Sequence, residues 1–270
     1  MSRDWSDIIL ELDLDKVSAE INAVEEGQPD MAQYERQDAR ALVLVAAERW
    51  LPYDLEEWEL AGVEEEYNSP TFRGILDLRG RHKGVLKAFA GHAGAPFIAD
   101  WKTTKGALDA DWANRYKYSW QWPLYCMAYP ETRLFSFRGI SRSGETREVI
   151  IEVPEGKASE AAAHLAQVRA MKDQLAGQAP WPRKMPGSCK AYGRDCEFKE
   201  TCWGNVVITG DIDMTKPFSY SGSEVFLLCP EKHRLTQLAG YGEDDEVLAF
   251  GKAVHRGLAE VYKQAFKLGQ

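Results

Sequence analysis

The sequence predicts an α/β protein in which helices flank a central β-sheet. Short, partly alternating apolar runs separated by glycines lie between Trp58 and Thr104, and such runs are typical of strands. Segments with apolar residues at helical spacing lie on either side, over residues 37–51 and 158–178. A chain in which strand-like and helical patterns follow one another is typical of a fold with helices layered on a sheet.

Each element follows from its local pattern. The helix over 37–51 is expected to end before Pro52, because proline lacks a backbone N–H. The strand-like runs that follow are WELAGVEEEY, FRGILDLRGRHKG, VLKAFAG and PFIADWKTT. A helical segment, DADWANRYKYSWQWPLYCMAYP, then extends to Pro130, and RLFSFRGISRS and REVIIEVP predict two further strands.

Composition limits the class of protein. With 270 residues, 44% hydrophobic and 28% charged, the chain can bury one large core or two small ones. No apolar run approaches the roughly 18 residues of a spanning helix, and the acidic N-terminus does not resemble a signal peptide. We therefore expect a cytoplasmic or nucleoplasmic protein that does not bind membranes. The net charge of −9 argues against wholesale binding to a polyanion but allows a local basic groove.

The stretch FIADWKTT places Asp100 and Lys102 on one face of a strand and Trp101 on the other. Asp77 ends the strand-like GILD. Two carboxylates on neighbouring strands repel each other unless a cation neutralises them, which predicts a Mg²⁺ or Mn²⁺ site. Lys102 would orient or deprotonate an attacking water, or neutralise charge on phosphate. The alternative is an exposed strand end with an ordinary ion pair.

Gln121 and Tyr125 are four positions apart in a helical segment and therefore share one helix face. Their polar ends are expected to reach a phosphate or a metal-bound water. The alternative for Tyr125 is a tyrosine anchored in the core with its hydroxyl at the rim.

In this order, FRGILDLRG, FIADWKTTKG and SWQWPLY resemble the motifs of the PD-(D/E)xK nucleases, in the branch related to the RecB nuclease domain and the CRISPR-associated adaptation nucleases. The resemblance implies a mixed central sheet flanked by helices, the restriction-endonuclease-like core. It also implies Asp77 and Asp100 as metal ligands, Lys102 as the catalytic lysine, and Gln121 and Tyr125 as supporting residues on the DNA side.

The first motif of that branch lies in an unusual place. The family normally begins with S-x-S, an apolar run and C-P, followed by a helix with G-x-x-x-H. Here the matching segments are Ser221–Ser223, Leu227–Pro230 and Phe250–His255, near the C-terminus. We expect a circular permutation in which His255 joins Asp77 and Asp100 at the metal. The alternatives are a helix histidine facing solvent or core, and a tail that completes the site of another chain.

Cys189, Cys196 and Cys202 form a C-x6-C-x5-C run, which is typical of a soft-metal or iron–sulfur site. A fourth ligand would be Cys126 or Cys229, and the resemblance favours Cys229. We expect a structural [4Fe-4S] cluster with zinc as the alternative. Disulfides, or cysteines without metal, are the remaining interpretation.

The expected organisation is an N-terminal helical segment (1–57), a nuclease core (58–180), a cysteine region (181–217) and a permuted segment (218–270). The expected function is a metal-dependent exonuclease on single-stranded DNA or DNA ends, in phage recombination or repair, with recombination or replication proteins as partners. Basic residues near the proposed site would hold phosphates: Arg73, Arg79, Arg81, Lys83, Lys105, Arg115 and Lys117. The alternatives are a catalytically silent DNA-binding or assembly subunit and a cysteine–metal module that binds a protein.

Overall fold

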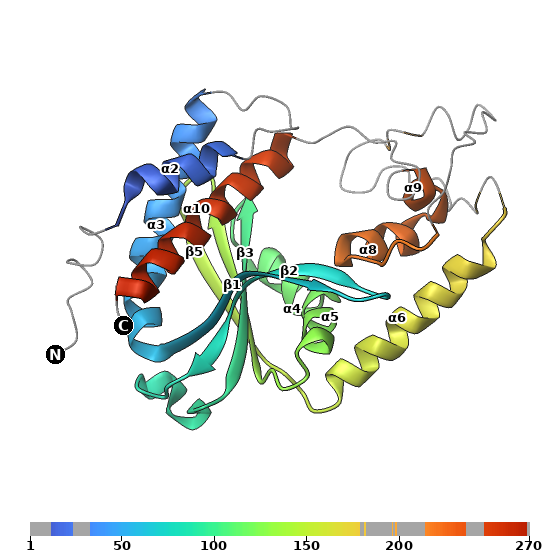
Figure 1. Ribbon diagram of the computed structural model, residues 1–270, viewed down its shortest axis with the longest axis horizontal. Coiled ribbons are helices and arrows are strands. Elements are labelled where there is room, and N and C mark those ends of the chain that lie inside the picture. Colours follow the sequence, from blue (N-terminus) through green and yellow to red (C-terminus); the bar gives the residue numbers. More distant parts are fainter. Residues whose placement is uncertain are drawn as a thin grey trace.

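One mixed β-sheet forms the centre of the protein (Figure 1). The computed structural model describes residues 12–23, 33–178, 181, 196, 198, 214–235 and 246–268. In these residues five strands pair in sequence order: β1 (Trp58–Asn68), β2 (Arg73–His82), β3 (Pro96–Thr104), β4 (Leu134–Ser141) and β5 (Thr146–Glu152). β3 and β4 are parallel and the other neighbours antiparallel, which confirms the predicted α/β fold with a mixed sheet.

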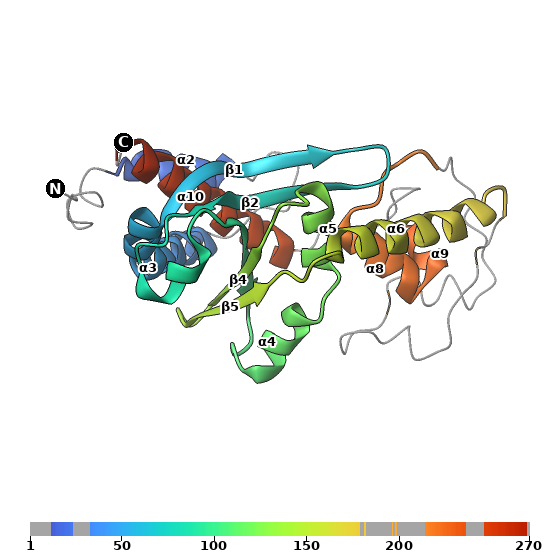
Figure 2. The ribbon, with the colours of Figure 1, turned by 90° about the horizontal axis from the view of Figure 1, so that it is seen from below.

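Helices from both ends of the chain lie together on one face of the sheet (Figures 1 and 2). They are α2 (Leu14–Asn22), α3 (Gln33–Glu57) and α10 (Glu246–Leu268). The same core contains Phe97, Ala99 and Trp101, the alternate residues of β3. Gly257 lets α10 approach α3, because a Cβ there would lie 2.7 Å from Val43 Cγ2.

The opposite face of the sheet packs against a second core. It is covered by α4 (Ala110–Lys117), α5 (Gln121–Ala128), α6 (Lys157–Gln174) and α8 (Tyr220–Leu228), with the short α9 (Pro230–His233) following α8. Ile98 of β3 and Phe135 and Phe137 of β4 point into this core. None of the helices in the described part of the chain has the length and apolar character needed to cross a bilayer.

The predicted end of the first long helix is wrong, because α3 continues through Pro52 to Glu57. Its last turns are held by tertiary contacts. Arg138 of β4 donates two hydrogen bonds to Asp54, at 2.5 and 2.8 Å, and Tyr262 of α10 donates to the same carboxylate at 2.5 Å. Breaking a buried ion pair costs about 3–5 kcal/mol, which outweighs the proline's local penalty of about 3 kcal/mol.

The run VLKAFAG is also not the strand that its composition suggests. It contains the 3₁₀ helix η2 (Lys87–His92), which lies outside the sheet. The Glu57 carboxylate accepts hydrogen bonds from the backbone N–H groups of Gly84 and Leu86, at 2.8 and 2.7 Å. These bonds use the donors that a strand would offer to a neighbour and turn the chain away from the sheet.

The helical segment that ends at Pro130 is divided in two. α4 ends at Lys117, and α5 begins at Gln121. The indole N–H of Trp122 donates to the Lys117 carbonyl at 3.1 Å, which satisfies one of the orphan acceptors at the end of α4. This break places Gln121 in the first turn of a new helix that faces the sheet.

Candidate active site

The site is built where β2 and β3 separate. Their pairing extends no further than Leu78 and Ala99. At the next position the Asp77 Oδ2 atom accepts a hydrogen bond from the Trp101 backbone N–H at 2.6 Å, so a side chain takes the place of a backbone carbonyl and the strands form a fork. β2 stays paired with β1 on both sides of Asp77, so the expectation that the strand ends at this residue is wrong.

β3 presents Asp100 and Lys102 to the face of the sheet opposite α10. The Lys102 ammonium forms an ion pair with Asp100 Oδ2. It also lies 5.8 Å from the ring centre of Tyr116 and 5.7 Å from that of Phe137. Asp100 is 3% exposed. A buried carboxylate and a half-buried ammonium, rather than an exposed strand end, therefore occupy this position.

α5 places its first residue against the acidic pair. Gln121 Nε2 donates a hydrogen bond to Asp100 Oδ1 at 2.9 Å. One turn later, Tyr125 packs against the rings of Phe72 and Phe135, and a Cβ at Gly74 would lie only 2.7 Å from its Cε1. Burial raises the pKa of Tyr125, and the Asp100 charge raises it further. The tyrosine ring is thus a core element close to the carboxylates.

His255 reaches the same fork from α10. Its Nδ1 lies 3.2 Å from Asp77 Oδ1, and its ring lies edge-on to Trp101 with ring centres 6.1 Å apart. A Cβ at Gly251, one turn earlier, would lie 3.0 Å from Thr103 Oγ1, so the glycine allows α10 to approach β3. His255, which lies near the C-terminus of the sequence, therefore contacts Asp77 of the same chain.

The charges at the fork are coupled. Burial raises the pKa of Asp77, but His255, Lys102 and the Trp101 N–H outweigh it and leave the pKa below its usual value. Burial tends to lower the pKa of His255, and the Asp77 carboxylate reverses this, so the net shift is upward. These two residues therefore favour an ionised pair.

The pKa of Asp100 shifts in the opposite direction to that of Asp77. Burial raises its pKa to about 6, with Lys102 opposing the shift and Asp77 adding to it. Burial tends to lower the pKa of Lys102, but the two aspartates raise it above its usual value. Lys102 consequently remains an ammonium at neutral pH, whereas Asp100 is poised to exchange a proton for a cation.

Among the described residues, no three His, Cys, Asp or Glu side chains are gathered in a metal-binding arrangement. At the fork, Asp77 is bonded to His255 and to the Trp101 N–H. The donor set nevertheless fits a divalent cation. Asp100 Oδ2 is buried and accepts no hydrogen bond of ordinary geometry, apart from its ion pair with Lys102. Carboxylate oxygens are hard ligands, which Mg²⁺ and Mn²⁺ prefer.

Glu64 is a residue of this region that sequence reasoning missed. It lies between the β1 residues that pair with Leu78 and Leu76, and it has a left-handed backbone with φ of 49°. Burial raises its pKa, while Lys263 on α10, 3.9 Å away, opposes the shift. It belongs to the glutamate run EEE, which is typical of a solvated strand face, and no signal in the sequence distinguishes it.

Of the four cysteines expected to bind a metal, the structure describes Cys196 and Cys229, both half-buried and free of disulfides. Cys189 and Cys202 lie outside the described residues. Cys229 ends α8 and Pro230 begins α9. Cys126 is buried in α5, and burial raises its pKa to about 12, in keeping with a small hydrophobic core residue.

The basic residues expected to hold phosphates have different surroundings. Arg79 donates to Glu65 at 2.6 and 2.8 Å, Arg81 to the Gly94 carbonyl at 2.9 Å, and Lys83 to the Leu55 carbonyl at 3.0 Å. Arg115 and Lys117 lie on α4 and flank Tyr116, whose ring neighbours Lys102, in the sequence. The basic residues of α4 are therefore the better placed for a substrate.

A mixed sheet whose forked strands present two carboxylates and a lysine defines the class of metal-dependent nucleases. A family model of the PD-(D/E)XK nuclease superfamily matches residues 7–203, and the chain belongs to this superfamily. Membership implies metal-dependent nuclease activity on DNA, typically with Mg²⁺ or Mn²⁺. The matched region ends before α8, so His255 enters the site from outside it. No curated protein matches the chain.

Proposed function

We propose that the chain is a DNA exonuclease that acts on single strands or DNA ends, in recombination or repair. One observation carries the proposal: β2, β3, α5 and α10 bring Asp77, Asp100, Lys102, Gln121 and His255 to a single fork. A chain that only bound DNA would have no need of two buried carboxylates beside a half-buried ammonium, which are costly to desolvate.

Asp77, Asp100 and His255 would hold the cation. When bound, Mg²⁺ or Mn²⁺ supplies an activated water and neutralises charge on the phosphate. Gln121 fixes Asp100 by donating to Oδ1, which leaves Oδ2 directed toward the lysine side. His255 would act as a ligand through a ring nitrogen of its neutral imidazole.

Lys102 acts as a fixed positive charge in this mechanism. Its raised pKa keeps the ammonium protonated at neutral pH, so it stabilises charge that develops on the phosphate rather than removing a proton from water. The rings of Tyr116 and Phe137 limit its hydration, which strengthens its electrostatic effect.

The exposed aromatic at the end of α4 supports a single-stranded substrate. Tyr118 is 76% exposed, and the Lys117 ammonium lies 5.8 Å from its ring centre. Exposed rings beside basic residues suit unpaired bases, because stacking adds about 1–3 kcal/mol per base to the phosphate contacts.

The test is a time course on end-labelled single-stranded and duplex DNA with Mg²⁺ or Mn²⁺. We expect mononucleotide release that chelation abolishes and that Lys102→Ala slows at least about a hundredfold. Lys87→Ala on η2 is the matched control, with native activity. If the native protein and Lys102→Ala both leave every DNA intact but bind it equally, the silent-subunit alternative replaces this proposal.

We also assign a structural [4Fe-4S] cluster to Cys189, Cys196, Cys202 and Cys229, with zinc as the alternative. Cys229 supports this assignment, since it lies half-buried at the α8–α9 junction without a disulfide. Metal analysis of anaerobically purified protein distinguishes iron with labile sulfide from zinc. The loss of either metal in Cys229→Ser, but not in Cys126→Ser, is the expected result. Protein that contains neither metal would overturn the assignment.

The circular permutation is the third part of the proposal. Its support is that α10 packs on α2, α3 and β3, while its histidine contacts Asp77 of the same chain. Mixing Lys102→Ala with His255→Ala protein tests it, because a site built within one chain cannot be restored by mixing. Recovered cleavage would show that the helix serves another chain.

A further inference from the structure

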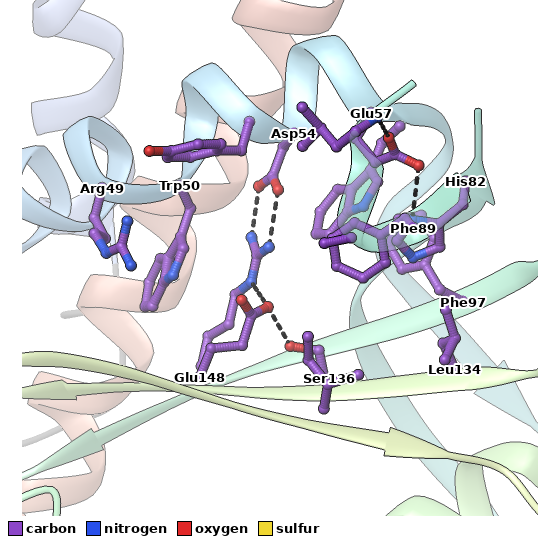
Figure 3. A pocket seen from close by; sticks show the side chains of 16 residues that line it. Arg49, Trp50, Asp54, Glu57, His82, Phe89, Phe97, Leu134, Ser136 and Glu148 are labelled. Carbon is purple, nitrogen blue, oxygen red and sulfur yellow. Dashed lines mark hydrogen bonds and ion pairs between the residues drawn. The ribbon is translucent and has the colours of Figure 1, made fainter. Parts of the chain in front are cut away.

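A cavity of about 440 Å³ lies between α3, η2 and the sheet, on the face that also carries α10 (Figure 3). Lys102 projects to the opposite face, so this cavity is separate from the proposed nuclease site. Protein interiors are close-packed and contain few voids larger than a water molecule, whereas ligand pockets have about 300–1,000 Å³. The volume is thus typical of a small-molecule site.

Five aromatic side chains line the cavity: Trp50, Tyr53, Trp58, Phe89 and Phe97. Trp58 and Phe97 are in contact, with ring centres 4.1 Å apart, and Phe89 stacks on His82 at 4.5 Å. Tyr53 is 53% exposed and so stands at the mouth. A wall of this kind favours a flat ring.

The cavity is held open by a buried polar network. The Arg138 guanidinium lies 5.1 Å from the Trp50 ring centre and 4.3 Å from that of Trp58. It donates to Asp54 at 2.5 and 2.8 Å and to Glu148 at 2.8 Å. Because both tryptophans rest on a fixed charge, the walls are preformed and a ligand need not order them.

Two charged groups on the same side of the cavity remain available (Figure 3). Glu148 Oε1 accepts from Ser136 at 2.6 Å and from Arg138, but Oε2 accepts no hydrogen bond from the described residues. Arg49 is exposed, lies 5.9 Å from the Tyr53 ring centre, and has no ion-pair partner in the described part of the chain. The site therefore offers an acceptor, a cation and aromatic faces.

We propose that this cavity binds a mononucleotide, with the base among the aromatic rings and the phosphate at Arg49. A base supplies both the flat ring and the N–H donors that Glu148 Oε2 lacks, and a phosphate is a strong partner for a guanidinium. An apolar ligand would leave both charged groups unused. An indole side chain from a protein would supply a ring and one N–H but no anion.

The experiment is calorimetric titration of the full chain in EDTA with GMP, AMP, CMP and UMP, and with the matching nucleosides. We expect at least one nucleotide to saturate a single site. Its nucleoside should bind roughly tenfold more weakly, because it lacks the charge-assisted contact of the phosphate. Arg49→Ala should weaken nucleotide binding to the nucleoside value and leave nucleoside binding unchanged.

Two further variants identify the site. Ala88 lines the cavity from the exposed surface of η2, so Ala88→Trp should abolish binding while the thermal midpoint stays native. Lys102→Ala should bind as the native protein does. The proposal is overturned if no nucleotide reaches saturation of the protein below about 10 mM. It is also overturned if Ala88→Trp still binds the nucleotide, or if Lys102→Ala does not bind it. Binding of N-acetyltryptophanamide in place of nucleotides would overturn it as well.

Discussion

Asp77 Oδ1 lies 3.2 Å from Nδ1 of His255, although 178 positions separate the two residues in the chain. The other oxygen of the same carboxylate accepts the Trp101 N–H and holds the fork between β2 and β3 open. One side chain therefore links the catalytic strands of a nuclease core to a helix that the family match does not include.

Replacing His255 by alanine should weaken Mn²⁺ binding at least about tenfold, because an imidazole ligand would be lost and Asp77 would lose its partner. Calorimetric titration of the DNA-free protein measures this directly. His92→Ala, at a partly exposed position on η2, is the matched control and should bind as the native protein does. Equal affinity in both variants would remove His255 from the metal site.

Metal binding should depend on pH through Asp100. Its pKa is raised to about 6 by burial, so the carboxyl is mostly protonated at pH 5 and must release that proton to a cation. Mn²⁺ affinity should therefore rise with pH by about tenfold per unit for each proton that must leave, and it should level off only above the raised pKa of His255, because Asp100 and the imidazole both lose a proton to the cation. Titrations from pH 5 to 8 test this, and an affinity that is constant over the range contradicts it.

His233 should make the protein sensitive to acid. Burial among Trp181, Phe218 and Phe226 lowers its pKa from the usual 6.5 to about 4. Between these two values the unfolded chain binds a proton that the folded chain does not. The contribution of His233 to the free energy of unfolding is therefore fully present above pH 6.5 and is lost as the pH drops toward 4. The loss from this group is about 3 kcal/mol.

Urea unfolding at a series of pH values measures that loss. His233→Phe should reduce the slope between pH 6.5 and 4, because a ring that cannot be protonated fills the same space. His164→Phe, at a half-buried position on α6, is the control and should keep the native slope. An unchanged slope in His233→Phe would show that other groups control the acid response.

Removing the hydroxyl of Tyr262 should destabilise the protein by about 1–3 kcal/mol, since a buried Asp54 oxygen would lose a donor. Tyr262→Phe keeps the ring contact with Trp101, whose centre is 5.4 Å away, so only the polar network changes. The free energy of unfolding in urea is the measurement. Tyr53→Phe is the matched control at an exposed position, and an equal effect in both variants would contradict the importance of the network.

The parts of the site that depend on short-range patterns could be predicted from the sequence. Alternation along a strand places Asp100 and Lys102 together and Trp101 opposite them. The spacing of Gln121 and Tyr125 predicts that they share a helix face. The expected partner of Gln121 is a phosphate or a metal-bound water, whereas in the structure its amide instead donates to Asp100. The side on which a residue lies within one strand or one helix turn follows from local geometry alone.

The parts that depend on distant partners could not be predicted. α3 passes through Pro52 because Arg138 and Tyr262 hold Asp54 from 84 and 208 positions away. The left-handed backbone of Glu64 occurs where β1 lies opposite Asp77 of β2. The helix η2 forms next to backbone N–H groups that are bonded to the Glu57 carboxylate. In each case long-range contacts outweigh the local preference of the sequence.

The distance along the chain between Asp77 and His255 also sets the time at which their contact can first form during synthesis. A ribosome adds about 5–20 residues per second, so roughly 10–35 s pass between the synthesis of the two residues. During that interval the nascent chain holds the acidic strands without the histidine.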